Sequence, residues 1–293
     1  MKEIVVLSGK GGVGKSVLTA SLGWLLGGKH RVTLADTDVD APNLHLTLGA
    51  ELQTSREIKT SEKALIDYEK CLRCLQCQEV CRFSAIIGTE SPLVVPYSCE
   101  GCGACAIICP AQAIIIDKVV NGRINVFSTK RLVVVAGELH IGESSSGLLV
   151  DMVKETARKK AEQTGAEILL IDGPPGIGCP VIAAVRGANY VMAVTEPTPA
   201  ALHDLDRVIQ VIRHFHVPVG IVINRAGLHD ASKNAIYRYA EENNHSILAE
   251  IPKDRMVTQA IVDGRPVVAA YPDAPSAKAI RRLTERVREE IML

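Results

Sequence analysis

Short runs of apolar residues recur along the chain, and helical stretches separate most of them. The runs without polar alternation are 3–8, 31–36, 132–137, 167–172, 190–197 and 219–226. The stretches with helical spacing are 15–26, 146–163, 200–215 and 232–243. Apolar strands that alternate with helices indicate a parallel sheet covered on both faces. The pattern therefore predicts an α/β fold with a doubly wound, mostly parallel sheet, in which any ligand site lies at the carboxyl ends of the strands.

This alternation stops between about residues 50 and 130, where cysteines, glycines and prolines gather. The segment 119–126 contains Asn121-Gly122, a strong turn signal, and predicts a β-hairpin. We expect an α/β domain formed by 1–57 and 119–293, interrupted by an inserted domain at 58–118.

Charge and composition exclude some functions. Lys plus Arg and Asp plus Glu both number 33, so the net charge is zero and gives no general attraction to nucleic acid. The N-terminus shows no signal peptide, and no uncharged apolar run approaches the ~18 residues of a spanning helix. We therefore expect a soluble, cytoplasmic protein with no nucleic-acid partner.

The first apolar run leads directly into a phosphate-binding loop, Gly9 to Ser16, which reads GKGGVGKS. In such a loop the backbone N–H groups of Gly11, Gly12, Val13 and Gly14 surround phosphates at the start of a helix. Lys15 then reaches the terminal phosphates, and the Ser16 hydroxyl ligates Mg²⁺. The alternative is a glycine-rich turn without nucleotide. The motif favours an ATP-binding, Mg²⁺-dependent enzyme.

Lys10 is a second lysine at the start of the same loop, too far forward to replace Lys15. Here the sequence resembles the deviant Walker A ATPases, the MinD, ParA, Mrp and nitrogenase iron protein group of P-loop NTPases (SIMIBI type). The resemblance implies a nucleotide-dependent homodimer in which Lys10 reaches the partner's phosphates and assists hydrolysis. The alternative for Lys10 alone is a solvated surface lysine.

The same resemblance assigns roles to residues at the ends of other strands. In 36–43, which matches switch I, Asp38 would orient the attacking water, and Asp36 would support Mg²⁺ through water. In 168–178, which matches Walker B and switch II, Asp172 would lie near Mg²⁺ and Gly176 would sense the γ-phosphate. The expected adenine-side residues are Asn224, Arg225 and Pro252.

Eight of the nine cysteines lie between 71 and 109 and form a repeat with a shift of 28 residues. Cys71, Cys74, Cys77 and Cys81 recur as Cys99, Cys102, Cys105 and Cys109, and the segment 84–87 recurs as 112–115. In a long cytosolic chain such clustering indicates metal binding rather than disulfides. The repeat implies an insert built from two related halves.

The spacing resembles that of bacterial two-cluster ferredoxins, in which the fourth cysteine of each run ligates the other cluster. By that resemblance the insert is an α+β ferredoxin domain with two [4Fe–4S] clusters. The ligands would be Cys71, Cys74, Cys77 and Cys109 for one cluster, and Cys99, Cys102, Cys105 and Cys81 for the other. Arg82 stands where proline is usual. Zinc is the alternative, since thiolates also bind it.

The remaining features carry less chemistry. Cys179 lies at the offset from Asp172 where the nitrogenase iron protein places a ligand of its dimer-bridging cluster, but 141–147 lacks the second cysteine of that site. We therefore expect Cys179 to be a small buried residue beside switch II. The histidines, including His214 and His216, form no ligand set, and 279–293 is expected to be a docked closing helix.

Together these features predict an ATPase that gates electron transfer through two [4Fe–4S] clusters to a redox partner. One alternative is an assembly or carrier factor for iron–sulfur clusters or other metallocofactors, with a client protein as its partner. The other is a MinD-like spatial organiser whose clusters are structural or sensory.

Overall fold

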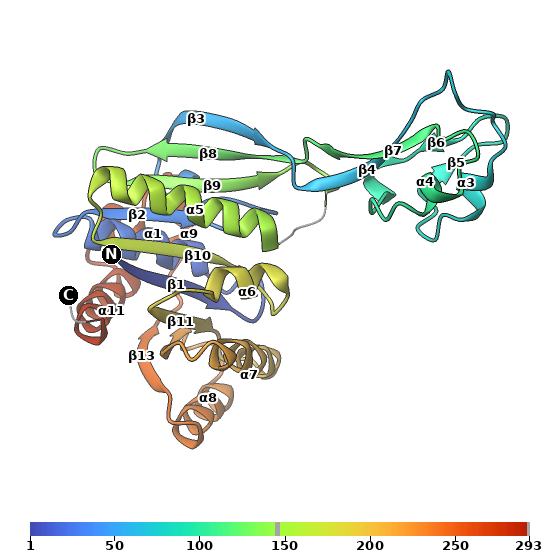
Figure 1. Ribbon diagram of the computed structural model, residues 1–293. Coiled ribbons are helices and arrows are strands. Elements are labelled where there is room, and N and C mark those ends of the chain that lie inside the picture. The colour runs from blue at the N-terminus through green and yellow to red at the C-terminus, as the bar shows by residue number, and fades with distance from the viewer. Residues whose placement is uncertain (144–146, 292–293) are drawn as a thin grey trace. The chain divides into compact units, whose positions relative to one another are not determined.

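The chain folds into two compact units (Figure 1). The computed structural model describes residues 1–143 and 147–291. Unit 1 comprises Met1–Ser55, Ile124–Glu138 and Ser145–Leu293, and unit 2 comprises Arg56–Arg123 and Leu139–Ser144. Unit 2 contains the eight clustered cysteines.

A nine-stranded sheet organises unit 1, in the order β13-β12-β11-β1-β10-β2-β9-β8-β3. Its strands are β1 (Lys2–Ser8), β2 (Val32–Asp36), β3 (Glu51–Ile58), β8 (Gly122–Ser128), β9 (Val133–Leu139), β10 (Ile168–Pro175), β11 (Tyr190–Thr195), β12 (Val219–Asn224) and β13 (Ser246–Ile251). The pairings from β13 across to β9 are all parallel. This confirms the predicted doubly wound, mostly parallel α/β fold.

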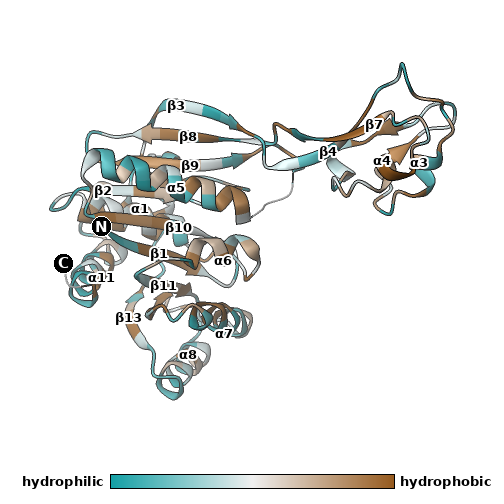
Figure 2. Ribbon diagram, in the orientation of Figure 1, coloured by the Kyte–Doolittle hydropathy of each residue, from teal (hydrophilic) through white to brown (hydrophobic). Residues whose placement is uncertain are grey.

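Helices cover both faces of this sheet. They are α1 (Lys15–Leu26), α2 (Leu44–Thr47), α5 (Gly147–Thr164), α6 (Cys179–Val185), α7 (Pro199–His214), α8 (Asp230–Glu242), α9 (Arg255–Val262), α10 (Val267–Ala270) and α11 (Pro275–Glu290). The central strands are buried along almost their whole length, and β10 begins with an unbroken hydrophobic run, 168–171 (Figure 2). Burial on both faces is why these strands show no polar alternation.

The C-terminal helix α11 packs against α1, α10 and β13. Ile280, Leu283 and Val287 of α11 join the core of unit 1. This agrees with the closing helix expected at 279–293, of which residues 292–293 lie outside the described part. None of the helices within 1–143 and 147–291 has both the length and the apolar character needed to cross a bilayer.

Unit 2 is built from short elements. They are β4 (Ser61–Ile66), α3 (Gln76–Glu79), β5 (Ile86–Ile87), β6 (Leu93–Val94), the 3₁₀ turn η1 (Pro96–Ser98), α4 (Ala104–Ile108) and β7 (Ile114–Val119). β4 pairs antiparallel with β7, and β5 with β6. The small core includes Cys77, Cys99 and Cys105, together with Ile86 and Ile114.

The predicted hairpin at 119–126 is wrong. β7 pairs with β4, whereas β8 belongs to the large sheet. Neither Asn121 nor Gly122 has the positive φ that a two-residue hairpin turn requires. Instead, the Asn121 side-chain oxygen accepts from Thr60 N at 2.7 Å, and Asn121 N donates to Ile58 O at 3.1 Å. Through these long-range bonds Asn121 connects its own segment to residues 58–60 and does not form a turn.

Candidate nucleotide and cysteine sites

The phosphate-binding loop joins β1 to α1 at the carboxyl edge of the sheet. Gly14 is the N-cap of α1 with φ +97°, and a Cβ at this position would collide with Asn224 Nδ2. The same Nδ2 donates to Val13 O at 2.6 Å. Only glycine satisfies both the backbone angle and this close approach. The loop is thus braced by Asn224 from the end of β12.

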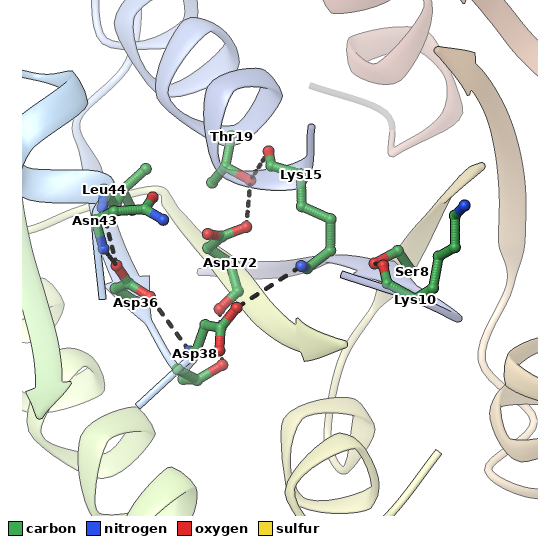
Figure 3. Close-up of polar contacts among 10 residues, drawn as sticks. Ser8, Lys10, Lys15, Thr19, Asp36, Asp38, Asn43, Leu44 and Asp172 are labelled. Atoms are coloured by element: carbon green, nitrogen blue, oxygen red, sulfur yellow. Dashed lines mark hydrogen bonds and ion pairs between the residues drawn. The ribbon is translucent and has the colours of Figure 1, made fainter. Parts of the chain in front are cut away.

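Lys15 and Asp38 face each other at this edge (Figure 3). The Lys15 side chain is buried, and its Nζ lies 3.9 Å from Asp38 Oδ2. Burial raises the pKa of Asp38 to about 6, Lys15 opposes this rise, and the neighbouring carboxylates Asp172 and Asp40 add to it. The structure therefore brings together a lysine suited to phosphate oxygens and a carboxyl group poised near neutral pH.

Asp172 lies within the buried part of β10, beside helix α1. Its Oδ1 accepts from Thr19 Oγ1 at 2.9 Å. Its Oδ2 is buried and has no hydrogen-bond partner among the described residues. Burial raises the pKa of Asp172, whereas Lys15 and Ser16 counteract the rise. An orphaned buried carboxylate oxygen beside Lys15 and Ser16 fits a hydrated Mg²⁺, because hard cations prefer such oxygens.

Asp36 is fully buried at the end of β2, and both of its oxygens accept backbone hydrogen bonds. Oδ2 accepts from Asn43 N and Leu44 N at 3.0 Å each, and Oδ1 accepts from Asp38 N at 3.2 Å. Burial and then the charge of Asp172 raise its pKa well above the ordinary value. This carboxylate shapes the loop 36–43 that carries Asp38.

Lys10 points away from Lys15 and Asp38 (Figure 3). Its Nζ lies 2.7 Å from Oε1 of Glu196, and Arg225 Nη1 donates to Glu196 Oε2 at 2.8 Å. Burial works to raise the pKa of Glu196, but hydrogen bonds from Lys10 and Arg225 outweigh burial and lower it. Within its own chain, Lys10 is therefore an ion-paired side chain rather than a free one.

A cavity of about 550 Å³ adjoins the loop and is lined by the predicted adenine-side residues Asn224, Arg225 and Pro252. Its other lining residues include Gly14, Val17, Leu18, Glu196, Leu228, Ile251, Val257 and Ile261. The lining also includes the polar residues Lys253, Asp254, Arg255 and Thr258. A cleft with both apolar and polar groups beside a phosphate loop suits a purine base.

Beyond Asp172, the chain reaches α6 through Gly176, whose N donates to Ser8 O at 3.0 Å. Cys179 begins α6 and is exposed, so the expectation of a buried residue is wrong. The buried residues of α6 are Val181, Ala183, Ala184 and Val185, which leaves its first position facing outward. In the stretch 141–147, residues 144–146 lie outside the described part.

The cysteine repeat of unit 2 is also a repeat of backbone conformation. Arg73, Leu75 and Ser84 have positive φ, and so do Gly101, Gly103 and Gln112, which are 28 positions later. Helix α3 begins at 76 and α4 at 104. Cys81 Sγ accepts from Ala85 N and Cys109 Sγ from Ala113 N, both at 3.3 Å. The two halves therefore share one local fold.

Further backbone N–H groups point at cysteine sulfurs. Ala64 N donates to Cys99 Sγ and Arg73 N to Cys71 Sγ, both at 3.4 Å. Neutral thiol sulfur is a weak acceptor, whereas thiolates and cluster sulfurs use such donors. The arrangement suits sulfurs that carry negative charge.

A small cavity of about 20 Å³ in unit 2 is lined by Cys71, Cys74, Cys77 and Cys109, together with Leu75 and Pro110. These four cysteines are the complete ligand set expected for one cluster. Within 1–143 and 147–291, no three His, Cys, Asp or Glu side chains gather closely enough to hold a single metal ion. The cysteines of a [4Fe–4S] site can lie farther apart than the ligands of a single ion, because each binds a different iron atom of the cluster.

Sequence reasoning missed Thr19 and Glu196. Thr19 lies one helical turn after Lys15, so its contact with Asp172 follows from helix spacing. Glu196 follows the last residue of β11, and its contact with Lys10 has no local sequence signal.

Comparison with known proteins gives one consistent picture. Residues 4–267 match the family model described as the CobQ/CobB/MinD/ParA nucleotide binding domain. An uncharacterized protein of Methanocaldococcus jannaschii is 34% identical over 289 residues, which cover 99% of this chain and 97% of that protein. The septum site-determining protein MinD of Helicobacter pylori is 26% identical, over 98% of this chain and 90% of its own.

Solved structures show the same fold. The septum site-determining protein MinD of Pyrococcus horikoshii, complexed with Mg-ADP, aligns with a TM-score of 0.62 at 20% identity. The alignment covers 99% of this chain and 96% of that one.

Proposed function

The chain belongs to the CobQ/CobB/MinD/ParA nucleotide-binding family, and we propose that it is a MinD-type switch, closed as a homodimer by Mg·ATP and opened by hydrolysis, with iron–sulfur clusters in unit 2. As a P-loop ATPase of the MinD/ParA type it hydrolyses ATP. The observation that carries the proposal is the meeting of Lys15, Asp38 and Asp172 at one edge of the sheet, next to a cavity suited to a base.

Each residue at this edge has a role set by its chemistry. Backbone N–H groups from Gly11 to Gly14 and the Lys15 ammonium bind phosphate oxygens, and Ser16 with Asp172 holds Mg²⁺. Mg²⁺, when bound, neutralises charge that develops on the phosphates. Asp38 accepts a proton from, or orients, the attacking water. Asn224, Arg225 and Pro252 surround the base.

Lys10 supplies the step that needs a second copy. It lies on the far side of the loop from Lys15, so we infer that it acts on the partner's phosphates across the closed dimer. In other NTPases, a positive charge supplied in trans stabilises the phosphoryl-transfer transition state and raises the hydrolysis rate by about 10³- to 10⁵-fold.

We infer that the cysteines of unit 2 hold two [4Fe–4S] clusters. The support is the cavity lined by Cys71, Cys74, Cys77 and Cys109, the duplicated backbone and the N–H donors aimed at sulfur. The second set is Cys99, Cys102, Cys105 and Cys81. Bound clusters supply one-electron redox chemistry.

The comparisons favour the MinD-like alternative over the leading expectation of ATP-gated electron transfer, because several of the relatives and solved structures are MinD proteins. Electron transfer to a redox partner remains the second candidate, and the cysteine-lined cavity is the observation that favours it. Electron paramagnetic resonance of the reduced protein separates the two. A spectrum or midpoint potential that changes with Mg·ATP supports electron transfer. A spectrum and potential that do not change with Mg·ATP support the MinD-type switch.

Turnover measured against protein concentration tests the dimer mechanism. We expect wild-type turnover per chain to rise with concentration, and Lys10→Ala to lower the plateau by about 10³-fold with ATP still bound. Lys15→Ala is the control that loses ATP binding itself. Wild-type turnover in Lys10→Ala would remove the dimer mechanism.

A further inference from the structure

Glu196 joins two cations that belong to different parts of the nucleotide site. One carboxylate oxygen lies 2.7 Å from Lys10 Nζ, at the start of the phosphate loop, and the other accepts from Arg225 at 2.8 Å. Arg225 and Glu196 both line the cavity beside the loop. The carboxylate therefore bridges the phosphate side and the base side of one site.

Burial divides these three groups into a fixed anion and movable cations. The side chain of Glu196 is 9% exposed, whereas those of Lys10 and Arg225 are 34% and 43% exposed. A buried carboxylate must keep a cationic partner, because leaving it unpaired is costly. If Lys10 swings away, Arg225 still pairs with Glu196, so release of Lys10 does not strand a buried charge.

The backbone at Lys10 is held in place while its side chain is free to change partner. Ser8 Oγ donates to Lys10 O at 2.7 Å. A lysine has a long flexible stem and a compact charge, which lets it exchange one anion for another. Any movement of Lys10 toward another anion therefore takes place in its side chain.

We propose that Glu196 is a positioning residue that retains Lys10 in its own subunit and so opposes closure of the nucleotide-bound dimer. This inference rests on the proposed function, in which Lys10 binds the partner's phosphates. Lys10 cannot pair with Glu196 and with those phosphates at once, so the two contacts compete. The strength of the internal pair sets the protein concentration at which the dimer forms.

Sedimentation of the full chain with Mg²⁺ and saturating AMPPNP, a non-hydrolysable ATP analogue, tests the competition. We expect half of the Glu196→Gln chains to be dimeric at a protein concentration about fivefold lower than wild type requires. A shift of this size is typical of coupled equilibria. Arg225→Gln leaves Glu196 with Lys10 as its remaining cation and shifts the concentration upward. Glu289→Gln, an exposed glutamate of α11, is the charge-matched control and behaves as wild type.

The outcomes separate the inference from its premise. If Lys10→Gln dimerises like wild type, the proposed in-trans role fails. If Lys10→Gln does not dimerise and Glu196→Gln needs the same or a higher concentration than wild type, the in-trans role stands and the retention by Glu196 is wrong. The double variant Lys10→Gln/Glu196→Gln must match Lys10→Gln alone, because a merely structural effect of Glu196 would persist without the lysine.

Discussion

At the scale of residues, the motifs predicted positions better than they predicted partners. Lys15, Asp38 and Asp172 lie together at the expected edge because a P-loop and the ends of parallel strands leave little choice. The salt bridge from Lys10 to Glu196 joins positions 186 residues apart, and no local pattern encodes it. Long-range side-chain contacts of this kind depend on packing, which a motif does not specify.

Asp38 gives a prediction about stability and pH. Its pKa rises from the ordinary 3.8 to about 6, chiefly through burial, so its charged form is disfavoured in the folded, nucleotide-free protein. Its contribution to stability is full below pH 3.8 and is lost as pH rises through about 6. Asp38→Asn removes this loss, so we expect it to raise the free energy of unfolding at pH 7 by about 1 kcal/mol, a figure reduced for partial solvent screening.

Thermal or urea unfolding at pH 7 and pH 4 measures this effect. The gain should shrink toward zero at pH 4, where the wild-type carboxyl is also neutral. A gain that stayed constant between the two pH values would mean that charge is not its cause. The same variant should lose ATP hydrolysis, in keeping with the proposed role of Asp38 in orienting water.

At the scale of elements, the pattern placed long helices and buried strands well and short elements poorly. Helix α1 has the predicted bounds 15–26, whereas β3, β4 and the short elements of unit 2 were not anticipated. Short exposed strands such as β3 offer little hydrophobic signal. Asn121-Gly122 misled because its bonds to Thr60 and Ile58 overrode the turn preference.

Helices α5 and α6 are joined by a buried lysine. Lys154 of α5 is 1% exposed, and its Nζ donates to Ala183 O, Ala184 O and Arg186 O at 2.7–3.0 Å. These are carbonyls at the C-terminal end of α6, where a helix lacks internal partners. We expect Lys154→Met to lower the free energy of unfolding at pH 7 by about 1–3 kcal/mol, because it leaves these carbonyls buried without donors.

The pH dependence identifies the lysine as the cause. Burial lowers the pKa of Lys154 from 10.5 to about 8, so the folded state disfavours the ammonium. The pH-dependent part of its contribution to stability is full above pH 10.5 and is lost as pH falls through about 8, while the hydrogen bonds to the carbonyls remain at pH 7. In urea unfolding, the free energy of unfolding of wild type should therefore rise relative to that of Lys154→Met as pH rises above 8. Lys159→Met, an exposed position on the same helix, should show neither effect.

The duplicated halves of unit 2 give a prediction about a glycine. Gly101 has φ +63°, and a Cβ there would lie 2.5 Å from Glu62 O. Its counterpart Arg73 already carries a side chain at φ +55°. We expect Gly101→Ala to lower the thermal midpoint and the iron content of the protein, at a cost of about 2 kcal/mol from backbone strain alone. Arg73→Ala is the matched control, and equal effects of the two variants would contradict this account.

At the scale of the whole molecule, three of the boundaries between the two units fall inside strands. They lie in β3, β8 and β9, and the fourth falls among residues outside the described part. The sequence predicted an insert at 58–118 from its cysteines and its broken strand-helix rhythm. It did not indicate that Leu139–Ser144 also belongs to unit 2, because this segment carries none of the cysteines that mark the insert.

The two units carry separate chemistries, and reciprocal variants test that separation. If each cluster takes its fourth cysteine from the opposite half, Cys81→Ser and Cys109→Ser each remove one cluster, or about four of about eight irons per chain. Both variants should bind Mg·ATP like wild type, because Lys15 and Asp172 belong to unit 1. Lys15→Ala should lose ATP binding and keep its iron, and Cys179→Ser should keep both.

Iron and acid-labile sulfide after anaerobic purification, with calorimetric nucleotide titration, measure the two properties together. Zinc in place of iron would contradict the assignment of [4Fe–4S] clusters. Loss of all iron in Cys81→Ser would show that the halves of unit 2 cannot fold with one cluster alone.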